Sequence, residues 1–335
     1  MCIRDRLITA ISFQEVNKMD ILKLKPVFKD YIWGGTRLKT DFGFKSDLDI
    51  LAEGWMLSCH KDGMNTIDGG EFDGQTLEEV IEKKGKEKLV GTRSLDFPYF
   101  PVLIKLIDAK DNLSIQVHPD NEYAKRVEHE FGKTEIWYVI DATPDAQLVY
   151  GFKEKISKEE FKKAIEENTL LDVLNTVNVK KGDLFFIEAG TVHAIGKGVL
   201  IAEIQQNSNS TYRVYDYGRI GKDGKPRELH VKKAVDVSVT EPPKYDIKPM
   251  GDKVIGDGFD STLLTKCDLF TVNHYDVEKS LTLEADEKSF NHVLVIDGEG
   301  KINGKELKKG DSFFIPAGFG KYEICGKCEI IVTNI

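Results

Sequence analysis

The sequence predicts a mainly β protein made of two jelly-roll β-barrel modules, the first of which carries a helical insertion. Three observations support this fold class. The chain contains many short strand-like segments bounded by glycine, and it contains few helical patterns. In addition, the block at 182–190 recurs at 310–318. Many short strands with few helices are typical of sandwiches, barrels and jelly rolls.

The composition is that of an ordinary globular protein. The 335 residues include 41% apolar and 31% charged side chains, and the net charge is −9. Collagen, coiled-coil and disordered chains are therefore excluded. No apolar run approaches the roughly 20 residues of a membrane span. Nucleic-acid binding depends on basic surface, so we expect neither a nucleic-acid nor a membrane partner. An anionic substrate would need a local basic cluster.

The cysteines indicate a reducing compartment. Their number is odd and their spacing irregular, which excludes a disulfide framework: Cys2, Cys59, Cys267, Cys325 and Cys328. We therefore expect the protein to be cytoplasmic. Cys325 and Cys328 form a C-x-x-C pattern inside a strand-like segment. We interpret it as a hairpin with a turn at Gly326-Lys327, because a zinc ribbon needs a second cysteine pair and a redox motif needs a helix.

The first 18 residues fit poorly with the rest of the chain. Their apolar stretch is too short and interrupted for a signal peptide, and no cleavage site follows. We expect residues 1–18 to be a non-native or disordered extension and the native start to be Met19.

Strands are predicted at 101–107, 114–117, 135–141, 183–187, 292–297 and 312–316, from alternating or short apolar runs. Helices are predicted at 76–90 and 157–174, and a shorter one at 123–130. The two longer ones begin with a capping-box pattern, Thr76 with Glu79 and Ser157 with Glu160.

The repeat predicts the division into modules. Tyr138-Val-Ile-Asp141 matches Leu294-Val-Ile-Asp297, and 113–118 matches 269–274, both at an offset of 156 residues. The glycine blocks match at an offset of 128 residues, so 28 residues are inserted in the first copy, where the helix at 157–174 lies. We place the first module at 19–245, its insertion at about 152–178 and the second module at 246–335.

Two segments suggest a metal site in the first module. In the strand Leu113-Ser-Ile-Gln-Val-His-Pro119, alternation places Ser114, Gln116 and His118 on one face, and buried polar groups there need partners. The segment Gly182-Asp-x₄-Glu-Ala-Gly-Thr-Val-His193 resembles the second cupin motif, in which glycines turn the chain so that the histidine points into the barrel. Glu188 stands where that motif has proline.

The second module lacks this set. The alignment places Asn291 opposite Glu135, Val272 opposite Gln116 and Lys321 opposite His193, and only His274 remains, opposite His118. We therefore predict one metal site, in the first module, and a structural role for His274. The predicted ligands are two imidazoles, one carboxylate and one amide oxygen, a set that suits one Zn²⁺ per chain: Gln116, His118, Glu135 and His193. With one anionic ligand the site keeps a charge near +1, which is typical of a Lewis-acid catalyst.

Four blocks together closely resemble the type I mannose-6-phosphate isomerases, in particular the short bacterial form. They are Ser114-Ile-Gln-Val-His-Pro-Asp120, Gly132-Lys-Thr-Glu-Ile-Trp-Tyr138, Gly190-Thr-Val-His-Ala-Ile195 and Glu203-Ile-Gln-Gln-Asn-Ser-Asn-Ser-Thr-Tyr-Arg-Val-Tyr-Asp216. Tyr31-Ile-Trp-Gly-Gly-Thr-Arg-Leu38 matches the opening segment of the family, and the resemblance extends from about Met19 to the C-terminus.

The resemblance implies a zinc-dependent aldose–ketose isomerase that interconverts mannose 6-phosphate and fructose 6-phosphate through an enediol. It implies the same four zinc ligands, an active-site arginine at Arg213 and an active-site lysine at Lys133. It also implies that Ser114 helps to hold phosphate. Eukaryotic members have a lysine where this chain has Arg219, which we assign to phosphate binding because arginine is a poor proton donor.

The sequence does not decide whether Glu203 or a zinc-bound water is the general base. Lys133 is expected either to help move protons or to hold phosphate. The alternatives are another cupin sugar-phosphate isomerase, such as a glucose-6-phosphate isomerase, and a non-catalytic sugar-phosphate-binding double cupin. The presence of the four ligands together with Lys133 and Glu203 argues against a protein that only binds. We expect a monomer or a weak homodimer.

Overall fold

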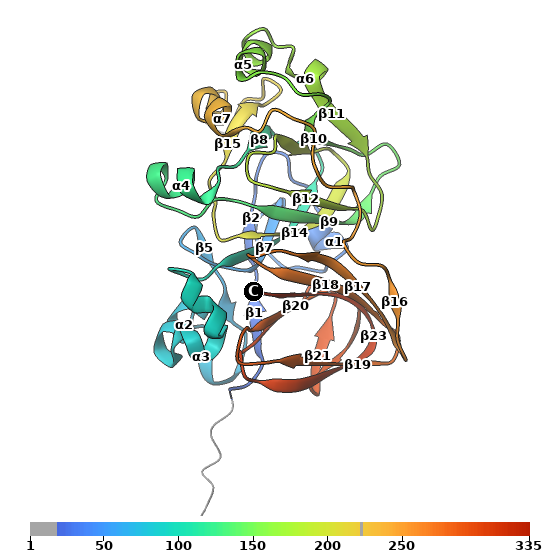
Figure 1. The fold of residues 1–335 in the computed structure, drawn as a ribbon. Coiled ribbons are helices and arrows are strands. Elements are labelled where there is room, and N and C mark those ends of the chain that lie inside the picture. Colours follow the sequence, from blue (N-terminus) through green and yellow to red (C-terminus); the bar gives the residue numbers. More distant parts are fainter. Residues whose placement is uncertain (1–18, 222–223) are drawn as a thin grey trace, which may run out of the picture.

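Three large β-sheets form most of the described part of the chain (Figure 1). The computed structural model describes residues 19–221 and 224–335, so the prediction about residues 1–18 lies outside the described part. The six-stranded sheet has the order β12-β9-β14-β7-β3-β2. Its strands are β12 (Leu184–Ile187), β9 (Glu135–Ala142), β14 (Val199–Gln206), β7 (Val102–Ala109), β3 (Glu53–Leu57) and β2 (Val27–Lys29).

The five-stranded sheet has the order β11-β10-β13-β8-β15. Its strands are β11 (Leu174–Asn178), β10 (Gln147–Phe152), β13 (His193–Ile195), β8 (Ile115–Val117) and β15 (Tyr212–Tyr215). Helices α4 (Asn121–Val127), α5 (Lys158–Glu166), α6 (Leu170–Val173) and α7 (Val231–Val237) lie around this sheet, at the top of Figure 1. The side chains of β8 and β15 that face these helices are apolar, so the opposite face carries the polar ones.

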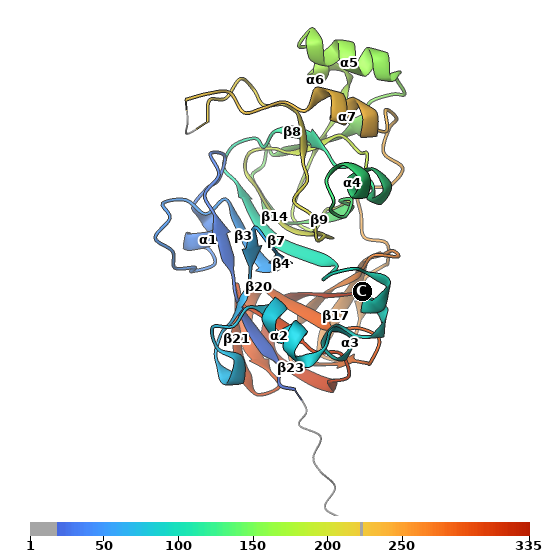
Figure 2. The ribbon, with the colours of Figure 1, turned by 90° about the vertical axis from the view of Figure 1, so that its left-hand side faces the viewer.

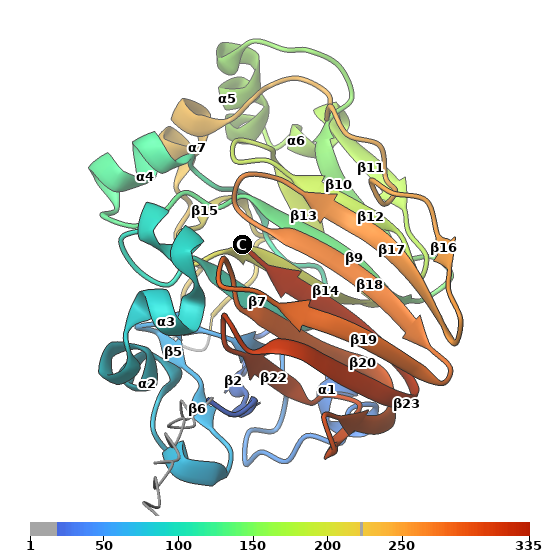
Figure 3. The ribbon, with the colours of Figure 1, turned by 60° about the horizontal axis from the view of Figure 1, so that its bottom comes forward.

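The ten-stranded sheet has the order β16-β17-β18-β23-β20-β22-β1-β6, with β19 on β23 and β21 on β20 (Figure 3). Its C-terminal strands are β16 (Val254–Ile255), β17 (Phe259–Lys266), β18 (Thr271–Val277), β19 (Ser280–Ala285), β20 (Asn291–Ile302), β21 (Lys305–Lys308), β22 (Ser312–Ile315) and β23 (Gly320–Asn334). Strands β1 (Leu22–Lys25) and β6 (Thr66–Ile67) come from the start of the chain.

The division that we predicted at residue 245 does not coincide with a division between sheets. Strand β1 pairs with β22 and so covers an edge that would otherwise expose unpaired backbone groups. Helices α2 (Leu77–Lys84) and α3 (Lys86–Val90) also lie against the C-terminal sheet (Figure 2). The backbone N–H of Ala317 donates to the carbonyl of Leu89, and the buried side chain of Leu89 joins the same core as Phe314 of β22.

The capping boxes that we predicted are both formed. The hydroxyl of Thr76 accepts from the backbone of Glu79, whose side chain accepts from the backbone of Thr76, and Ser157 and Glu160 repeat this arrangement. The predicted helix at 76–90 is interrupted at Gly85, which has φ 98°. The predicted helix at 157–174 is likewise divided into α5 and α6, because Asn168 adopts a left-handed conformation with φ 56°.

The smaller elements complete the chain between these parts. They are α1 (Arg37–Thr40), the two-stranded sheet of β4 (Cys59–His60) and β5 (Gly63–Met64), and the short 3₁₀ helices η1 (Gly70–Phe72) and η2 (Thr92–Asp96). Among the described helices, none combines the length and the apolar character that crossing a membrane requires.

The hairpin that we predicted around Gly326-Lys327 is wrong. Residues 320–334 form one continuous strand, β23. Both of its halves pair with the long strand β20, and Gly326, with φ 125°, alters the strand locally without reversing it. Cys325 and Cys328 both have free thiols.

The strand order shows an internal correspondence and corrects part of our alignment. The six-stranded order β12-β9-β14-β7-β3-β2 is matched by β22-β20-β23-β18-β17-β16. Ile187 pairs with Glu135 as Ile315 pairs with Asn291, which confirms that pair of equivalent positions. Strand β18, however, corresponds to β7 and not to β8, so placing Val272 opposite Gln116 and His274 opposite His118 is wrong. Short apolar strands resemble one another, and only the pairing partners distinguish them.

The position of His193 also differs from the alignment. Tyr322 pairs with Leu283 across β23 and β19, as His193 pairs with Gln116 across β13 and β8. Lys321 is exposed, whereas Tyr322 is buried. The counterpart of His193 inside the second sheet is therefore Tyr322 and not Lys321.

Candidate metal centre

The candidate site lies between the five-stranded and six-stranded sheets and is assembled by strand register. His193 on β13 lies opposite Gln116 on β8, and Gln116 lies opposite Arg213 on β15. Opposed residues of antiparallel strands project to the same face, so these three side chains form a row. The six-stranded sheet supplies Glu135 from β9 and Glu203 from β14. The row from the five-stranded sheet and the two glutamates from the six-stranded sheet face one interior space.

Three buried side chains form a compact cluster within this space. The ligand atoms of His118, Glu135 and His193 all lie within 4.8 Å of one another. The two Nε2 atoms of His118 and His193 are 3.2 Å apart. Oε2 of Glu135 is 3.8 Å from Nε2 of His118, and Oε1 is 3.6 Å from Nε2 of His193. A carboxylate and two imidazoles at this spacing are a donor set for a divalent metal ion.

The outer nitrogens of both histidines are occupied, which determines the tautomer that faces the cluster. Nδ1 of His118 lies 2.8 Å from the carbonyl of Ser210, and Nδ1 of His193 lies 2.8 Å from the carbonyl of Thr191. A carbonyl only accepts, so Nδ1 carries the proton and the lone pair of Nε2 points inward. Burial lowers the pKa of His193 to about 3, and burial with the charge of Lys133 holds the pKa of His118 well below its usual range. Both rings are therefore neutral, as metal ligands must be.

The buried carboxylate of Glu135 has few polar partners for an anion. Nζ of Lys133 lies 2.9 Å from Oε2 as an ion pair, and among the described residues no further donor bonds either oxygen. Burial raises the pKa of Glu135. A buried carboxylate beside two inward lone pairs fits a metal ion, which would satisfy all three groups.

Gln116 lies beside this cluster, as predicted for the fourth ligand. Its side-chain amide nitrogen is 3.5 Å from Nε2 of His193. Rotation of the amide by 180° exchanges its oxygen and nitrogen, so the oxygen can take the same position. The arrangement is compatible with an amide-oxygen ligand.

Lys133 lies against the cluster in a nearly fully buried position. Its Nζ is 3.2 Å from Nε2 of His118 and 3.9 Å from Oε1 of Glu203. The sequence-predicted pair Lys133 and Glu203 therefore lies at the candidate metal centre. Glu203 accepts a hydrogen bond from Nε1 of Trp137 at 3.0 Å, which orients its carboxylate.

Lys105 and Glu53 belong to the same buried charge network and were missed by the sequence analysis. Nζ of Lys105 lies 3.1 Å from Oε1 of Glu203 and 3.6 Å from Oε2 of Glu53. Burial acts to raise the pKa of Glu203, but the charges of Lys105 and Lys133 outweigh it and the pKa is lowered. The available signal was a lysine inside the apolar run at 102–107 of this strand, where a buried charge must have a partner.

Arg213 and Ser114 form the next part of the site. Nε of Arg213 donates to Oγ of Ser114 at 3.3 Å, and Nη1 donates to the carbonyl of Glu228 at 2.9 Å. Ser114 is buried and Arg213 is half-buried. One polar edge of the guanidinium is thus held in place beside the metal-centre row.

Arg219 is held by an acidic partner that the sequence analysis did not consider. Its guanidinium pairs with Asp216 and with the carbonyl of Asn112. Arg227 reaches the same carboxylate, with Nε 2.7 Å from Oδ2 of Asp216. The charges of Arg227 and Arg219 follow burial among the causes that lower the pKa of Arg213, so the three arginines form one basic cluster around Asp216.

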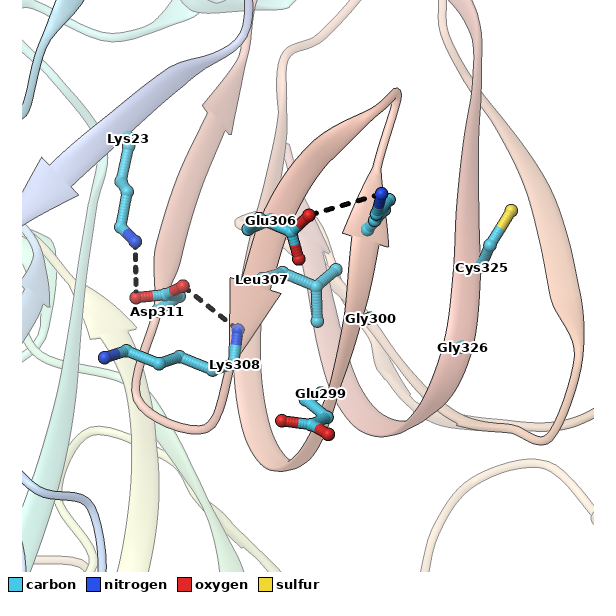
Figure 4. Close-up of a pocket in the computed structure, with 10 residues that line it drawn as sticks. Lys23, Glu299, Gly300, Glu306, Leu307, Lys308, Asp311, Cys325 and Gly326 are labelled. Carbon is cyan, nitrogen blue, oxygen red and sulfur yellow. Dashed lines mark hydrogen bonds and ion pairs between the residues drawn. The ribbon is translucent and has the colours of Figure 1, made fainter.

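A separate cavity of about 730 Å³ lies on the C-terminal part of the ten-stranded sheet (Figure 4). An ion pair of 2.7 Å between Lys23 and Asp311 lies at its side. None of the predicted site residues lines it. Among the residues that the structure describes, the one group of side chains spaced to hold a metal ion is the cluster above, which lies outside this cavity.

The mainly β architecture and the buried His–Glu–His cluster define a cupin-type protein with a candidate metal centre. Comparison with known proteins narrows this class. Residues 21–145 match the family model of the type I phosphomannose isomerase catalytic domain, and residues 260–335 match that of the mannose-6-phosphate isomerase cupin domain.

Relatives match over almost the whole chain. Mannose-6-phosphate isomerase ManA of Bacillus subtilis is 40% identical and covers 94% of this chain and 98% of its own length. A mannose-6-phosphate isomerase of Streptococcus mutans is 37% identical, over 90% of this chain and 94% of that protein. The crystal structure of the mannose 6-phosphate isomerase from Bacillus subtilis superposes with a TM-score of 0.86 at 36% identity, covering 95% of this chain and all of the other. The chain belongs to the type I mannose-6-phosphate isomerase family, a family of aldose–ketose isomerases.

Proposed function

We propose that this protein is a zinc-dependent isomerase that interconverts mannose 6-phosphate and fructose 6-phosphate through an enediol. The observation that carries the proposal is the buried cluster of His118, Glu135 and His193 in a chain 40% identical to a mannose-6-phosphate isomerase. Neutral imidazoles with inward lone pairs and a buried carboxylate beside them support a site built for a metal ion.

One Zn²⁺ would be held by Gln116, His118, Glu135 and His193. When bound, it supplies a positive charge that stabilises an enediolate as a Lewis acid. Arg213, in the same row as Gln116 and His193, adds a fixed positive charge beside it. Electrostatic stabilisation of this kind is the largest contribution in many enzymes.

We propose that Glu203 moves the proton between C1 and C2 of the open-chain sugar. Its lowered pKa keeps the carboxylate ionised, and Trp137 and Lys105 hold its two oxygens in place. An ionised carboxylate can accept a proton from one carbon and return it to the other. Lys133, between Glu203 and the cluster, balances the charge of two buried carboxylates and can donate to a sugar oxygen.

The phosphate is proposed to bind at Ser114 and the arginine cluster. Ser114 offers a hydroxyl, and Arg213 retains donors beyond its bond to that hydroxyl. Asp216 already neutralises part of the charge of Arg219 and Arg227, so we assign Arg219 a secondary role in this binding.

We also propose that the fold consists of two related jelly-roll modules, the second without a metal site. The matched strand orders and the equivalent pairing of Glu135 and Asn291 support this. The four free thiols in the described part of the chain agree with the cytoplasmic location that we expect.

Isomerase activity on mannose 6-phosphate, measured before and after chelation and after return of zinc, tests the proposal. We expect activity that disappears with the chelator and returns with zinc. If the zinc-loaded protein leaves mannose 6-phosphate unchanged, glucose 6-phosphate and other aldose phosphates should be assayed next. A protein that binds these sugars without converting any of them would be a sugar-phosphate sensor.

A further inference from the structure

The two histidines of the cluster are oriented in different ways. Nδ1 of His193 bonds the carbonyl of Thr191, two residues earlier in its own turn. Nδ1 of His118 bonds the carbonyl of Ser210, which is 92 residues away in sequence. The orientation of His118 therefore depends on how well the segment containing Ser210 is held in place.

Glu130 holds that segment. Its Oε2 accepts from Oγ of Ser210 at 3.2 Å and, at the longer distance of 3.4 Å, from the backbone N–H of Asn209. Its Oε1 pairs with Nζ of Lys61 at 2.9 Å. The carboxylate is only 16% exposed. One side chain thus joins the β4–β5 hairpin, the connection before β9 and the segment before β15.

The surrounding charges favour the ionised form of Glu130. Burial acts to raise its pKa, but the hydrogen bond from Lys61 and the nearby ring of His60 outweigh it, and the pKa is lowered. Nδ2 of Asn209 also donates to Oδ2 of Asp62 at 2.8 Å, so the hairpin holds the segment directly as well as through Glu130. These contacts leave the carbonyl of Ser210 little freedom to move away from His118.

We propose that Glu130 is a positioning residue of the metal centre, which acts by holding the carbonyl of Ser210 against Nδ1 of His118. This inference rests on the zinc site of the proposed function. Outer partners that orient a ligating imidazole typically contribute 10- to 100-fold to metal affinity. The polar contacts of Glu130 are with Ser210, Asn209, Lys61 and His60 and not with the cluster, so we infer that its effect reaches the metal through Ser210 and His118.

The test is the rate at which zinc leaves the zinc-loaded protein in excess chromogenic chelator. We expect Glu130→Ala to release zinc about tenfold faster than the unmodified chain. Glu130→Gln keeps an acceptor for Ser210 and Asn209, so it should restore the rate to within about threefold. A zinc-release rate of Glu130→Gln close to that of the unmodified chain would show that Glu130 acts through its hydrogen bonds and not through its charge alone.

Glu128→Ala is the matched control. Glu128 lies in the same connection and is 24% exposed, but it accepts from Tyr212 and Lys233 and not from Ser210. We expect its zinc release to stay within about twofold of the unmodified chain. Equal acceleration in Glu128→Ala and Glu130→Ala would overturn the proposal, because general loosening of the connection would then be the cause.

Unchanged zinc release in Glu130→Ala would also overturn it. Should that variant not fold, Ser210→Ala decides, because it removes the hydroxyl that bonds Glu130 and keeps the carbonyl that bonds His118. An unchanged release rate in folded Ser210→Ala would likewise contradict the proposal. If the unmodified chain binds no zinc at all, the proposed function fails instead, so the two failures are distinguishable.

Discussion

The first and second halves of the molecule place different chemistry on matched strands. In β9 and β12, Glu135 lies opposite Ile187 and faces two histidines. In β20 and β22, Asn291 lies opposite Ile315 in the equivalent position. Its Nδ2 donates to the carbonyl of Glu284 and to Oη of Tyr322 at 3.0 Å.

The difference shows what a candidate metal centre requires of a protein interior. The first half contains buried charges that depend on one another, including a carboxylate whose close charged partner is Lys133. The second half fills the same space with apolar side chains and satisfies its central amide internally. The backbone pairing tolerates both solutions, so function in this fold is decided by which side chains project inward.

The largest difference between equivalent substitutions in the two halves is expected when a predicted metal ligand is removed. We expect His193→Ala to lose bound zinc and to lower kcat/KM by about 1,000-fold or more, since metal stabilisation of several kcal/mol is lost. The counterpart change, Tyr322→Phe, should leave both unchanged. Zinc content by elemental analysis and steady-state kinetics measure this. Normal zinc content in His193→Ala would contradict the ligand set.

The next largest difference between the halves is expected in stability, for substitutions at Lys105 and at its counterpart. Lys105→Met removes the buried ammonium group that Glu53 and Glu203 share, so we expect a loss of about 3–5 kcal/mol in the free energy of unfolding. Its counterpart is Asn273, which lies opposite Val332 as Lys105 lies opposite Glu203. Asn273→Ala should cost less than about 1 kcal/mol because Asn273 is partly exposed. Urea unfolding compares the two, and equal costs would show that the charge network does not support the fold.

The two halves share one acid-sensitive feature, a buried neutral histidine. Burial lowers the pKa of His292 to about 3, as it does for His193. The unfolded chain binds the proton more readily, so this stability is present above about pH 6.5 and is lost as the pH falls toward 3. At pH 5 the loss is about 2 kcal/mol for each such histidine.

His292→Gln tests this in the second half, away from the metal centre. The variant should lose less stability between pH 7.5 and pH 5 than the unmodified chain, by about 2 kcal/mol. The difference between the two pH values is the readout, so the cost of the substitution itself cancels. An identical pH dependence in both proteins would show that His292 does not contribute.

The smallest expected effect concerns the internal hydrogen bond of the second half. Tyr322→Phe removes one partner of Asn291, whose amide retains the carbonyl of Glu284. We expect a loss of about 1 kcal/mol in the free energy of unfolding. Thermal unfolding of Tyr322→Phe beside Tyr275→Phe, a tyrosine that is less buried, measures it. A neutral result for Tyr322→Phe would mean that the hydroxyl is satisfied in another way.

Much of the site was predictable from local patterns. The alternation in 113–119 placed Gln116 and His118 on one face, and the turn before His193 predicted that this residue is a ligand. The capping boxes and the mainly β class were also predicted correctly, because each depends on neighbours in sequence. The repeat around Glu135 and Asn291 was found because both strands keep the same sequence pattern.

Tertiary structure alone decided the pairings between distant strands. It placed Lys105 between Glu53 and Glu203, assigned β18 to the position of β7, and brought Ser210 to His118. It also made the segment around Cys325 part of one continuous strand, whereas the local sequence pattern favoured a turn there. The sequence by itself determined the residue types and their local faces, whereas burial and register, which arise only when distant strands meet, determined which charges became partners.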